Sequence, residues 1–352
     1  MDHWEDYVRR VVPYVPGEQP KEQGVIKLNT NENPYPPAPG VREALKKLDA
    51  ERLRFYPAPD CGVLVDAIAA YYGLSSSQIF AGVGSDDVLA MIFLTFFNSA
   101  KPILFPDITY SFYDVWADML RIPYETRALD ENFKIRAEDY DTENGGVIFP
   151  NPNAPTGIFM ELSEVERILS QNRQSVVVVD EAYIDFGGQS ALPLLAKYEN
   201  LLIVQTFSKS RSLAGMRIGF AMGSPKLISY LNAVKYSFNS YTLSYAALML
   251  GVEAMRDRKY FEETREKIIA TRAWSRRELE RLGFFCTDSK GNFLFAAHKR
   301  AAARDIFEAL KEKNIYVRHF QKERVDNYLR ISIGTQTEME TLVRCMEAYL
   351  NC

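Results

Sequence analysis

The chain has few of the residues on which metal centres and disulfide frameworks depend. Its 352 residues include only four cysteines and three histidines. They are Cys61, Cys286, Cys345 and Cys352, and His3, His298 and His319. No C-x-x-C spacing occurs in this long chain, which argues against a disulfide framework. No histidine lies at metal-ligand spacing from another ligand, so no metal site is expected. A His-dependent nucleophile triad is disfavoured because no G-x-S-x-G motif accompanies the histidines.

Strong net charge and long apolar runs are also missing. The formal net charge is −4, which gives no overall reason to expect nucleic-acid binding. The longest strongly apolar stretch, residues 88–97, is shorter than the roughly 20 residues that a membrane span needs. The first residues, MDHWED, are polar and acidic, unlike a signal peptide. We therefore expect a cytoplasmic protein.

Strand-like and helix-like segments alternate through the first two thirds of the chain. Strands are expected at 79–83, 103–105, 146–149, 176–179, 202–207 and 217–222, and helices at 41–48, 61–72, 87–97, 111–119 and 162–170. Ser163 and Glu166 have the spacing of a capping box at the start of the last helix. This alternation predicts an α/β fold with a mostly parallel sheet flanked by helices.

The pattern changes after a long charged helix expected at 256–282. Strand-like pieces at 292–296, 315–317 and 328–333 surround an amphipathic helix at 302–311. They predict a smaller α+β domain. We expect an N-terminal arm at 1–40 that belongs to this small domain, a large domain at 41–255, and the small C-terminal domain at 256–352.

Polar side chains follow three of the predicted strands. Gly84-Ser85-Asp86 stands at a strand-to-helix junction, where free N–H groups favour a phosphate, although a simple turn with an N-cap explains it equally well. Asp180 follows four valines, and a buried carboxylate there needs a cation or a proton donor. A structural salt bridge or a metal-binding carboxylate would explain it as well as a ligand site would. Lys209 follows the strand at 202–207, and Ser208 and Arg217 near it are suited to phosphate contacts. The default interpretation of a single lysine is a solvated side chain, and the alternative is a group of a ligand pocket.

One ligand would use all three loops. Pyridoxal 5′-phosphate (PLP) has an aldehyde for the lysine amine, a ring nitrogen for the carboxylate and a phosphate for the helix start. Tyr110, which follows the strand at 103–105, could stack on the ring, but taken alone it reads as a core or surface aromatic. The three loops together favour a PLP site.

Longer motifs in the same order resemble the fold-type I PLP-dependent aminotransferases. They are LNTNENPYPP (28–37), RFYPAP (54–59), GVGSDD (82–87), PDITYSFY (106–113), NPNAPTG (151–157), VVDEAYIDF (178–186), TFSKSRSLAGMRIGF (206–220) and LRISIG (329–334). Within this family the motifs are similar to the histidinol-phosphate aminotransferase branch. Together they span nearly the whole chain and are highly specific.

The resemblance assigns a role to each matching residue. It implies that Lys209 is the covalent anchor of the cofactor and the proton-transfer base, that Asp180 binds the ring nitrogen, and that Tyr183 binds the ring 3-hydroxyl. It places Ser85, Asp86, Ser208 and Arg217 around the phosphate and Tyr110 on the ring face. Tyr56 matches a tyrosine that reaches the neighbouring subunit's phosphate, which implies a homodimer.

One position departs from the family pattern. Ala154 stands where the family usually has an asparagine that touches the ring 3-hydroxyl. Asn153, one residue earlier, is the expected substitute through a shifted loop.

The resemblance also implies a substrate. Arg318 and Arg330 would bind the phosphate ester of histidinol phosphate and, in the other half-reaction, the carboxylate of glutamate, and Tyr14 matches a substrate-contacting tyrosine. The implied activity is ping-pong amino transfer between histidinol phosphate and 2-oxoglutarate in histidine biosynthesis. The alternatives are an aminotransferase of broad aromatic specificity, a lyase similar to threonine-phosphate decarboxylase, or a catalytically silent PLP-fold binding protein.

Overall fold

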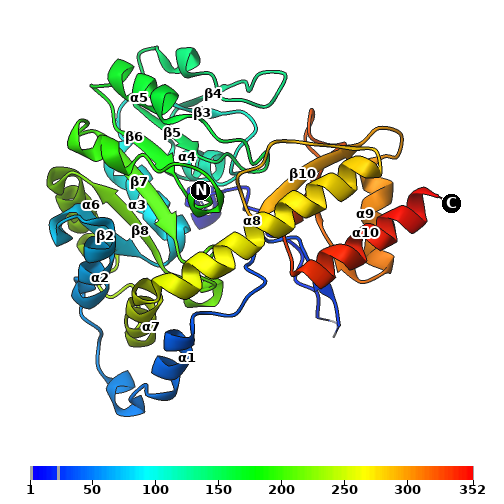
Figure 1. Cartoon of the computed structure of the whole chain (residues 1–352). Helices are drawn as coiled ribbons and strands as arrows, with labels where there is room; N and C mark the ends of the chain where they lie inside the picture. Colours follow the sequence, from blue (N-terminus) through cyan, green and yellow to red (C-terminus); the bar gives the residue numbers. More distant parts are fainter. Residues whose placement is uncertain (1–2, 22–23, 352) are drawn as a thin grey trace.

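A seven-stranded sheet forms the centre of the larger part of the chain in the computed structural model, which describes residues 3–21 and 24–351 (Figure 1). The strand order is β2-β8-β7-β6-β5-β3-β4. The strands are β2 (Ile79–Gly82), β3 (Ile103–Pro106), β4 (Tyr124–Arg127), β5 (Gly146–Pro150), β6 (Val177–Asp180), β7 (Leu201–Thr206) and β8 (Gly219–Gly223). Strand β8 is antiparallel to both neighbours, and the other pairs are parallel. The predicted mostly parallel sheet is confirmed.

Helices cover both faces of this sheet. They are α1 (Pro39–Lys46), α2 (Gly62–Tyr72), α3 (Gly84–Phe96), α4 (Tyr113–Leu120), α5 (Leu162–Gln171), α6 (Pro225–Phe238) and α7 (Tyr245–Arg256). Two separate clusters of buried apolar side chains lie against the two faces. The valine run of β6 is fully buried because it contributes to both clusters: Val177 and Val179 to one, Val178 to the other. Helix α2 ends at Tyr72, as predicted, and its C-cap Gly73 has a φ of 69°.

The smaller part of the chain begins at α8 (Arg258–Arg281), the long yellow helix in Figure 1. It has a four-stranded antiparallel sheet in the order β12-β13-β10-β9. Its elements are β9 (Phe284–Cys286), β10 (Phe293–His298), α9 (Ala303–Glu312), β11 (Ile315–Tyr316), β12 (Arg318–His319), β13 (Leu329–Ser332) and α10 (Gln336–Leu350). Strand β1 (Ile26–Lys27) pairs with β11, so the N-terminal segment joins this part of the molecule.

Short 3₁₀ helices complete the described secondary structure. They are Trp4–Tyr7, Ala50–Arg54, Ser76–Gln78, Ala137–Tyr140, Ile184–Phe186, Leu192–Ala196 and Ala214–Met216. In the described ranges, no helix is both long enough and apolar enough to cross a membrane.

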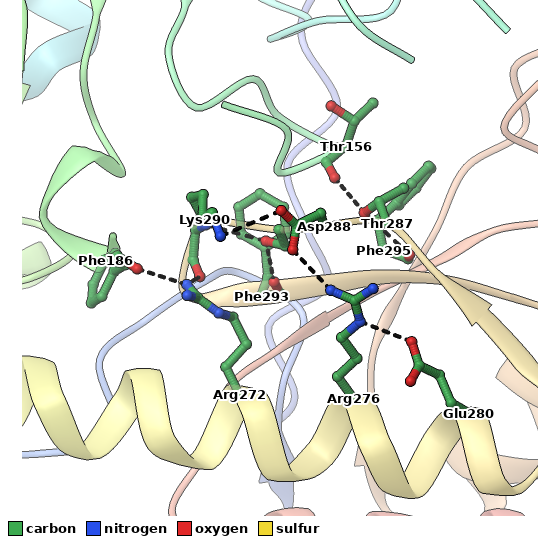
Figure 2. Close-up of polar contacts among 12 residues, drawn as sticks. Thr156, Phe186, Arg272, Arg276, Glu280, Thr287, Asp288, Lys290, Phe293 and Phe295 are labelled. Carbon is green, nitrogen blue, oxygen red and sulfur yellow. Dashed lines mark hydrogen bonds and ion pairs between the residues drawn. The ribbon is translucent and has the colours of Figure 1, made fainter. Parts of the chain in front are cut away.

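A buried arginine of α8 joins the two parts (Figure 2). Arg272 donates from Nη1 to the carbonyl oxygens of Phe186, at 2.8 Å, and Gly291, at 2.6 Å. Burial lowers the pKa of Arg272 to about 10. Beside it, the Thr287 hydroxyl donates to the carbonyl of Thr156 at 2.6 Å. These hydrogen bonds therefore connect the small part to backbone segments of the large part that follow β5 and β6.

The predicted capping box is wrong. Helix α5 begins after Glu161, and its N-cap makes no side-chain hydrogen bond. Ser163 therefore lies inside the first turn, and the side chain of Glu166 instead accepts hydrogen bonds from Lys197 and Tyr198. The S-x-x-E spacing does not by itself locate a helix start, because the same spacing occurs within a helix.

The predicted strand at 217–222 begins later than expected, since Arg217 has a φ of 52° and β8 starts at Gly219. Helices α6, α7 and α10 were not predicted.

Candidate active site

Eight of the ten predicted cofactor residues gather around one cavity of about 130 Å³ near the ends of β6 and β7 and the start of α3. Those that line it are Ser85, Asp86, Tyr110, Asp180, Tyr183, Ser208, Lys209 and Arg217. They come from separate segments of the chain, and they meet because the carboxyl ends of parallel strands lie at one edge of a sheet.

Asp180 ends β6 as a buried carboxyl group. Its Oδ2 accepts from the hydroxyl of Tyr113 at 3.0 Å, and its Oδ1 accepts from the backbone N–H of Ala182 at 3.2 Å. Burial raises the pKa of Asp180 to about 6, although both hydrogen bonds and the positive charge of Lys209 oppose the rise. Because burial makes the Asp180 carboxylate costly to ionise, a protonated ring nitrogen beside it would supply a positive charge that offsets this cost.

We expect Asp180→Asn to stabilise the cofactor-free protein at pH 8. Because the folded pKa of about 6 lies above the unfolded value near 3.9, stability falls as pH rises through this window and stays lower above it. Removing the buried charge should therefore raise the free energy of unfolding by about 3 kcal/mol at pH 8, and by roughly half as much at pH 5. Denaturant unfolding at both pH values measures this gap, with the exposed Asp141→Asn as the control. A gap that does not depend on pH would contradict the expectation.

The Lys209 amine points into the cavity from the loop after β7. Its Nζ donates to the carbonyl of Thr30 at 3.0 Å and lies 5.7 Å from the centre of the Tyr183 ring. The Asn33 side chain donates to the carbonyls of Lys209 and Ser210, each at 3.1 Å. A segment of the N-terminal arm therefore fixes both the backbone and the amine of the lysine.

The start of α3 offers unsatisfied N–H groups to an anion. The N-cap residue of α3, Val83, has no side chain that could accept hydrogen bonds from the N–H groups of the first turn. A Cβ on Gly219 would lie 2.3 Å from the carbonyl carbon of Gly84, and a Cβ on Gly84 would lie 2.5 Å from Nη2 of Arg217. Only glycines allow β8 and Arg217 to approach the helix start this closely, and this proximity creates a site suited to phosphate.

Arg217 connects the residues around this helix start. It donates to Asp86 at 3.1 Å and to the hydroxyl of Ser208 at 3.4 Å. The hydroxyl of Tyr110 donates to the other oxygen of Asp86 at 2.6 Å. Burial and the adjacent carboxylate raise the pKa of Tyr110, so its hydroxyl stays protonated.

Asn153 does not line this cavity, and Ala154 does. The Asn153 amide donates to the carbonyl of Ile108 at 2.9 Å and to Thr156 Oγ1 at 3.1 Å, and its oxygen accepts from Thr109 at 3.1 Å. Both of its donors are used, one to link this loop to the loop of Ile108 and one within its own loop. The structure therefore does not bring Asn153 to the position at which the asparagine of the family pattern was expected.

Arg318 and Arg330 face each other as direct partners across the antiparallel pair β12–β13. Two like charges in this position repel each other. Arg330 donates to the carbonyl of Asn29 at 3.1 Å, its Nε is buried without a partner, and burial lowers its pKa. Arg318 donates to the carbonyls of Val15 and Pro16 at 3.3 and 3.4 Å. An anion with several oxygen atoms would relieve the repulsion and satisfy the free donor.

The two remaining predicted residues are tyrosines. The Tyr14 ring stacks on Phe112 at 4.1 Å between ring centres. The interaction of Tyr14 with Arg330 partly opposes the fall of the Arg330 pKa that burial causes. Tyr56 is 82% exposed and stacks on Tyr241 at 4.6 Å, outside this chain's own cavity.

Several residues that organise the site were not predicted. Thr30, Asn31 and Asn33 contact Lys209 or Tyr183, and Tyr113 contacts Asp180. The motif LNTNENPYPP was an available signal, since it belongs to the family pattern, but no role had been attached to its individual residues.

A lysine amine, a buried carboxylate and an anion site at the strand ends of one sheet define a fold-type I PLP-dependent enzyme architecture. The family model for aminotransferase class I and II matches residues 23–345. The chain belongs to this family.

Its relatives include the histidinol-phosphate aminotransferase of Clostridium acetobutylicum, which is 53% identical over 336 residues and covers 96% of each chain. The histidinol-phosphate aminotransferase of Clostridium botulinum strain Langeland is 49% identical over 349 residues, 99% of each chain. The crystal structure of the Sinorhizobium meliloti histidinol-phosphate aminotransferase, in complex with pyridoxal-5′-phosphate, superposes with a TM-score of 0.84. It is 23% identical and covers 93% of this chain and 91% of that one.

Proposed function

We propose that this protein is a histidinol-phosphate aminotransferase that uses PLP. It transfers an amino group between L-histidinol phosphate and 2-oxoglutarate, giving imidazole-acetol phosphate and glutamate, in histidine biosynthesis. The facing pair Arg318 and Arg330 carries the proposal, because two arginines suit the phosphate ester of one substrate and the carboxylate of the other. Sequence identity of about half over nearly the full chain supports the same reaction.

When bound, PLP supplies an aldehyde that condenses with amines and a protonated ring that accepts the electrons of a broken Cα–H bond. Lys209 is proposed as the nucleophilic amine and as the base that moves the proton, and the Thr30 carbonyl orients its Nζ. Asp180 keeps the ring nitrogen protonated, since a buried carboxylate is stabilised by an adjacent cation.

Three further groups orient the cofactor in this proposal. Tyr183 binds the ring 3-hydroxyl and Tyr110 stacks on the ring. The start of α3, with Ser85, Asp86, Ser208 and Arg217, binds the phosphate.

Steady-state rates with histidinol phosphate, phenylalanine and tyrosine test the substrate. Two arginines for one phosphate should make kcat/KM for histidinol phosphate at least roughly a hundredfold higher than for either amino acid. Comparable values for all three would favour an aromatic aminotransferase. Spectral conversion of the bound cofactor by glutamate tests the reaction type, since a threonine-phosphate decarboxylase-like lyase would not undergo this half-reaction.

We also propose a homodimer in which Tyr56 binds the phosphate in the neighbouring site, in keeping with its exposure. Tyr56→Phe should weaken PLP binding roughly tenfold, because one hydrogen bond to a charged group is lost. Fluorescence titration measures the affinity, and Tyr230→Phe at another exposed position is the control. Sedimentation of the wild-type protein as a monomer, or an unchanged PLP affinity in Tyr56→Phe, would contradict this arrangement. A cytoplasmic location is part of the same proposal.

A further inference from the structure

Asn31 is a buried residue that connects the N-terminal arm to Tyr183. Its backbone N–H donates to the hydroxyl oxygen of Ser332 at 2.8 Å, and the Ser332 hydroxyl donates to Asn31 Oδ1 at 3.0 Å. The Asn31 Nδ2 lies 3.0 Å from the hydroxyl oxygen of Tyr183. The Asn292 side chain donates to the Asn31 carbonyl, also at 3.0 Å. Asn31 therefore makes hydrogen bonds through its backbone and through both ends of its side chain.

The direction of the protons in this chain of hydrogen bonds follows from its backbone donor and from the burial of Ser332. A backbone N–H can only donate, so the Ser332 oxygen accepts from it. The Ser332 hydroxyl is buried, and a buried hydroxyl proton without an acceptor is costly, so it is donated to Asn31 Oδ1, its acceptor among the described residues. This contact fixes the amide orientation and turns the NH₂ group toward Tyr183. The Tyr183 oxygen thus accepts from Asn31, and its own proton must be donated to a different partner.

Burial and backbone conformation keep this arrangement in place. Asn31 is 1% exposed and Ser332 is 2% exposed, so water does not compete for their hydrogen bonds. Asn31 has a φ of 54°, which asparagine tolerates better than most residues do. Ser332 lies two residues after Arg330 on β13, so both side chains share one face of the strand. The same strand face carries the arginine proposed for substrate binding and the serine that orients Asn31.

We propose that Asn31, oriented by Ser332, is a positioning residue that makes Tyr183 a hydrogen-bond donor toward the cofactor. The acceptor is the phenolic oxygen of the cofactor ring. This hydrogen bond stabilises the anionic form of the phenolic oxygen, so the bound cofactor loses its proton at a lower pH. This inference rests on the proposed function for the presence of PLP and for the role of Tyr183, but not on the identity of the amino donor.

The test is a pH titration of the visible absorbance of the holoenzyme without substrate. Asn31→Asp keeps the size of the side chain but presents an acceptor to Tyr183, so the tyrosine proton turns back toward residue 31. The midpoint should rise by about one pH unit, the effect of losing one hydrogen bond to an anion. Asn314→Asp is the matched control, because Asn314 is exposed and has a φ of 58°, similar to that of Asn31.

The same substitution in a Tyr183→Phe background separates the hydrogen bond from the added charge. The shift caused by Asn31→Asp should fall to less than half in this background, because the residue acts through the tyrosine hydroxyl. Equal shifts in both backgrounds, or no shift in either, would overturn the inference.

Ser332→Ala provides an independent test if the Asn31 variants do not fold. It frees the amide to rotate, and it should raise the midpoint by less than Asn31→Asp does, with recovery in Ser332→Thr. An unchanged midpoint in Ser332→Ala would then refute the inference. Failure of histidinol phosphate as a substrate leaves this titration intact, whereas a wild-type chain that takes up no PLP overturns both proposals.

Discussion

Lys209→Ala should lower kcat by a factor on the order of 10⁴, the largest effect expected of any single substitution. The reason is that one amine serves as the nucleophile and as the proton carrier, and no other lysine lines the cavity in the described part of the chain. Steady-state turnover and the visible spectrum of the bound cofactor measure the loss. The exposed Lys226→Ala is the matched control.

Lys209→Arg separates charge from chemistry. An arginine keeps a cation near the Thr30 carbonyl but does not readily lose its proton. We expect this variant to be as inactive as Lys209→Ala. Turnover within tenfold of wild type in either variant would remove Lys209 from the proposed role.

Arg330→Met should lower kcat/KM for histidinol phosphate by roughly 10²- to 10⁴-fold, since it removes two charge-assisted hydrogen bonds. The substrate-free protein should lose no stability and could become more stable, because the substitution relieves the repulsion across β12–β13. Kinetics and denaturant unfolding of the same variant test both halves of this expectation.

Arg318→Met should have a smaller kinetic effect than Arg330→Met. Arg318 already donates to two carbonyls of the N-terminal arm, whereas Arg330 has a buried Nε without a partner. The exposed Arg300→Met serves as the control. An Arg330→Met enzyme that keeps its preference for histidinol phosphate over phenylalanine would rule out the phosphate role of this pair.

Those parts of the site that depend on strand ends were predictable from the sequence. The valine run at 176–179 predicted a strand, and this placed Asp180 at the sheet edge beside the loop that carries Lys209. The strand-to-helix junction at Gly84-Ser85-Asp86 followed from the same rule, although the helix was expected to begin at residue 87 and begins at Gly84. Local patterns were sufficient here because the geometry of a parallel sheet brings successive strand ends together.

Contacts between distant segments were not predictable in this way. Nothing near Asn153 reveals that its amide donates to Ile108, 45 residues earlier, and nothing near Asn31 reveals that Ser332 orients it. The capping box failed because Ser163 and Glu166 have a spacing that also occurs within helices. Side-chain partners on segments far apart in the sequence are determined by tertiary packing, which periodicity does not encode.

The pairing of the N-terminal arm with the last strands has a consequence for synthesis. Asn31 and Ser332 are 301 residues apart in sequence, yet each needs the other for its hydrogen bonds. At typical rates of translation, roughly 15 to 60 s pass between the two residues leaving the ribosome. During that interval residues 30–33, which contact Lys209 and Tyr183 in the folded protein, cannot yet form their hydrogen bonds to Ser332 on β13. The nascent chain can thus build its large sheet early, but it acquires a competent enzyme only when translation is nearly finished.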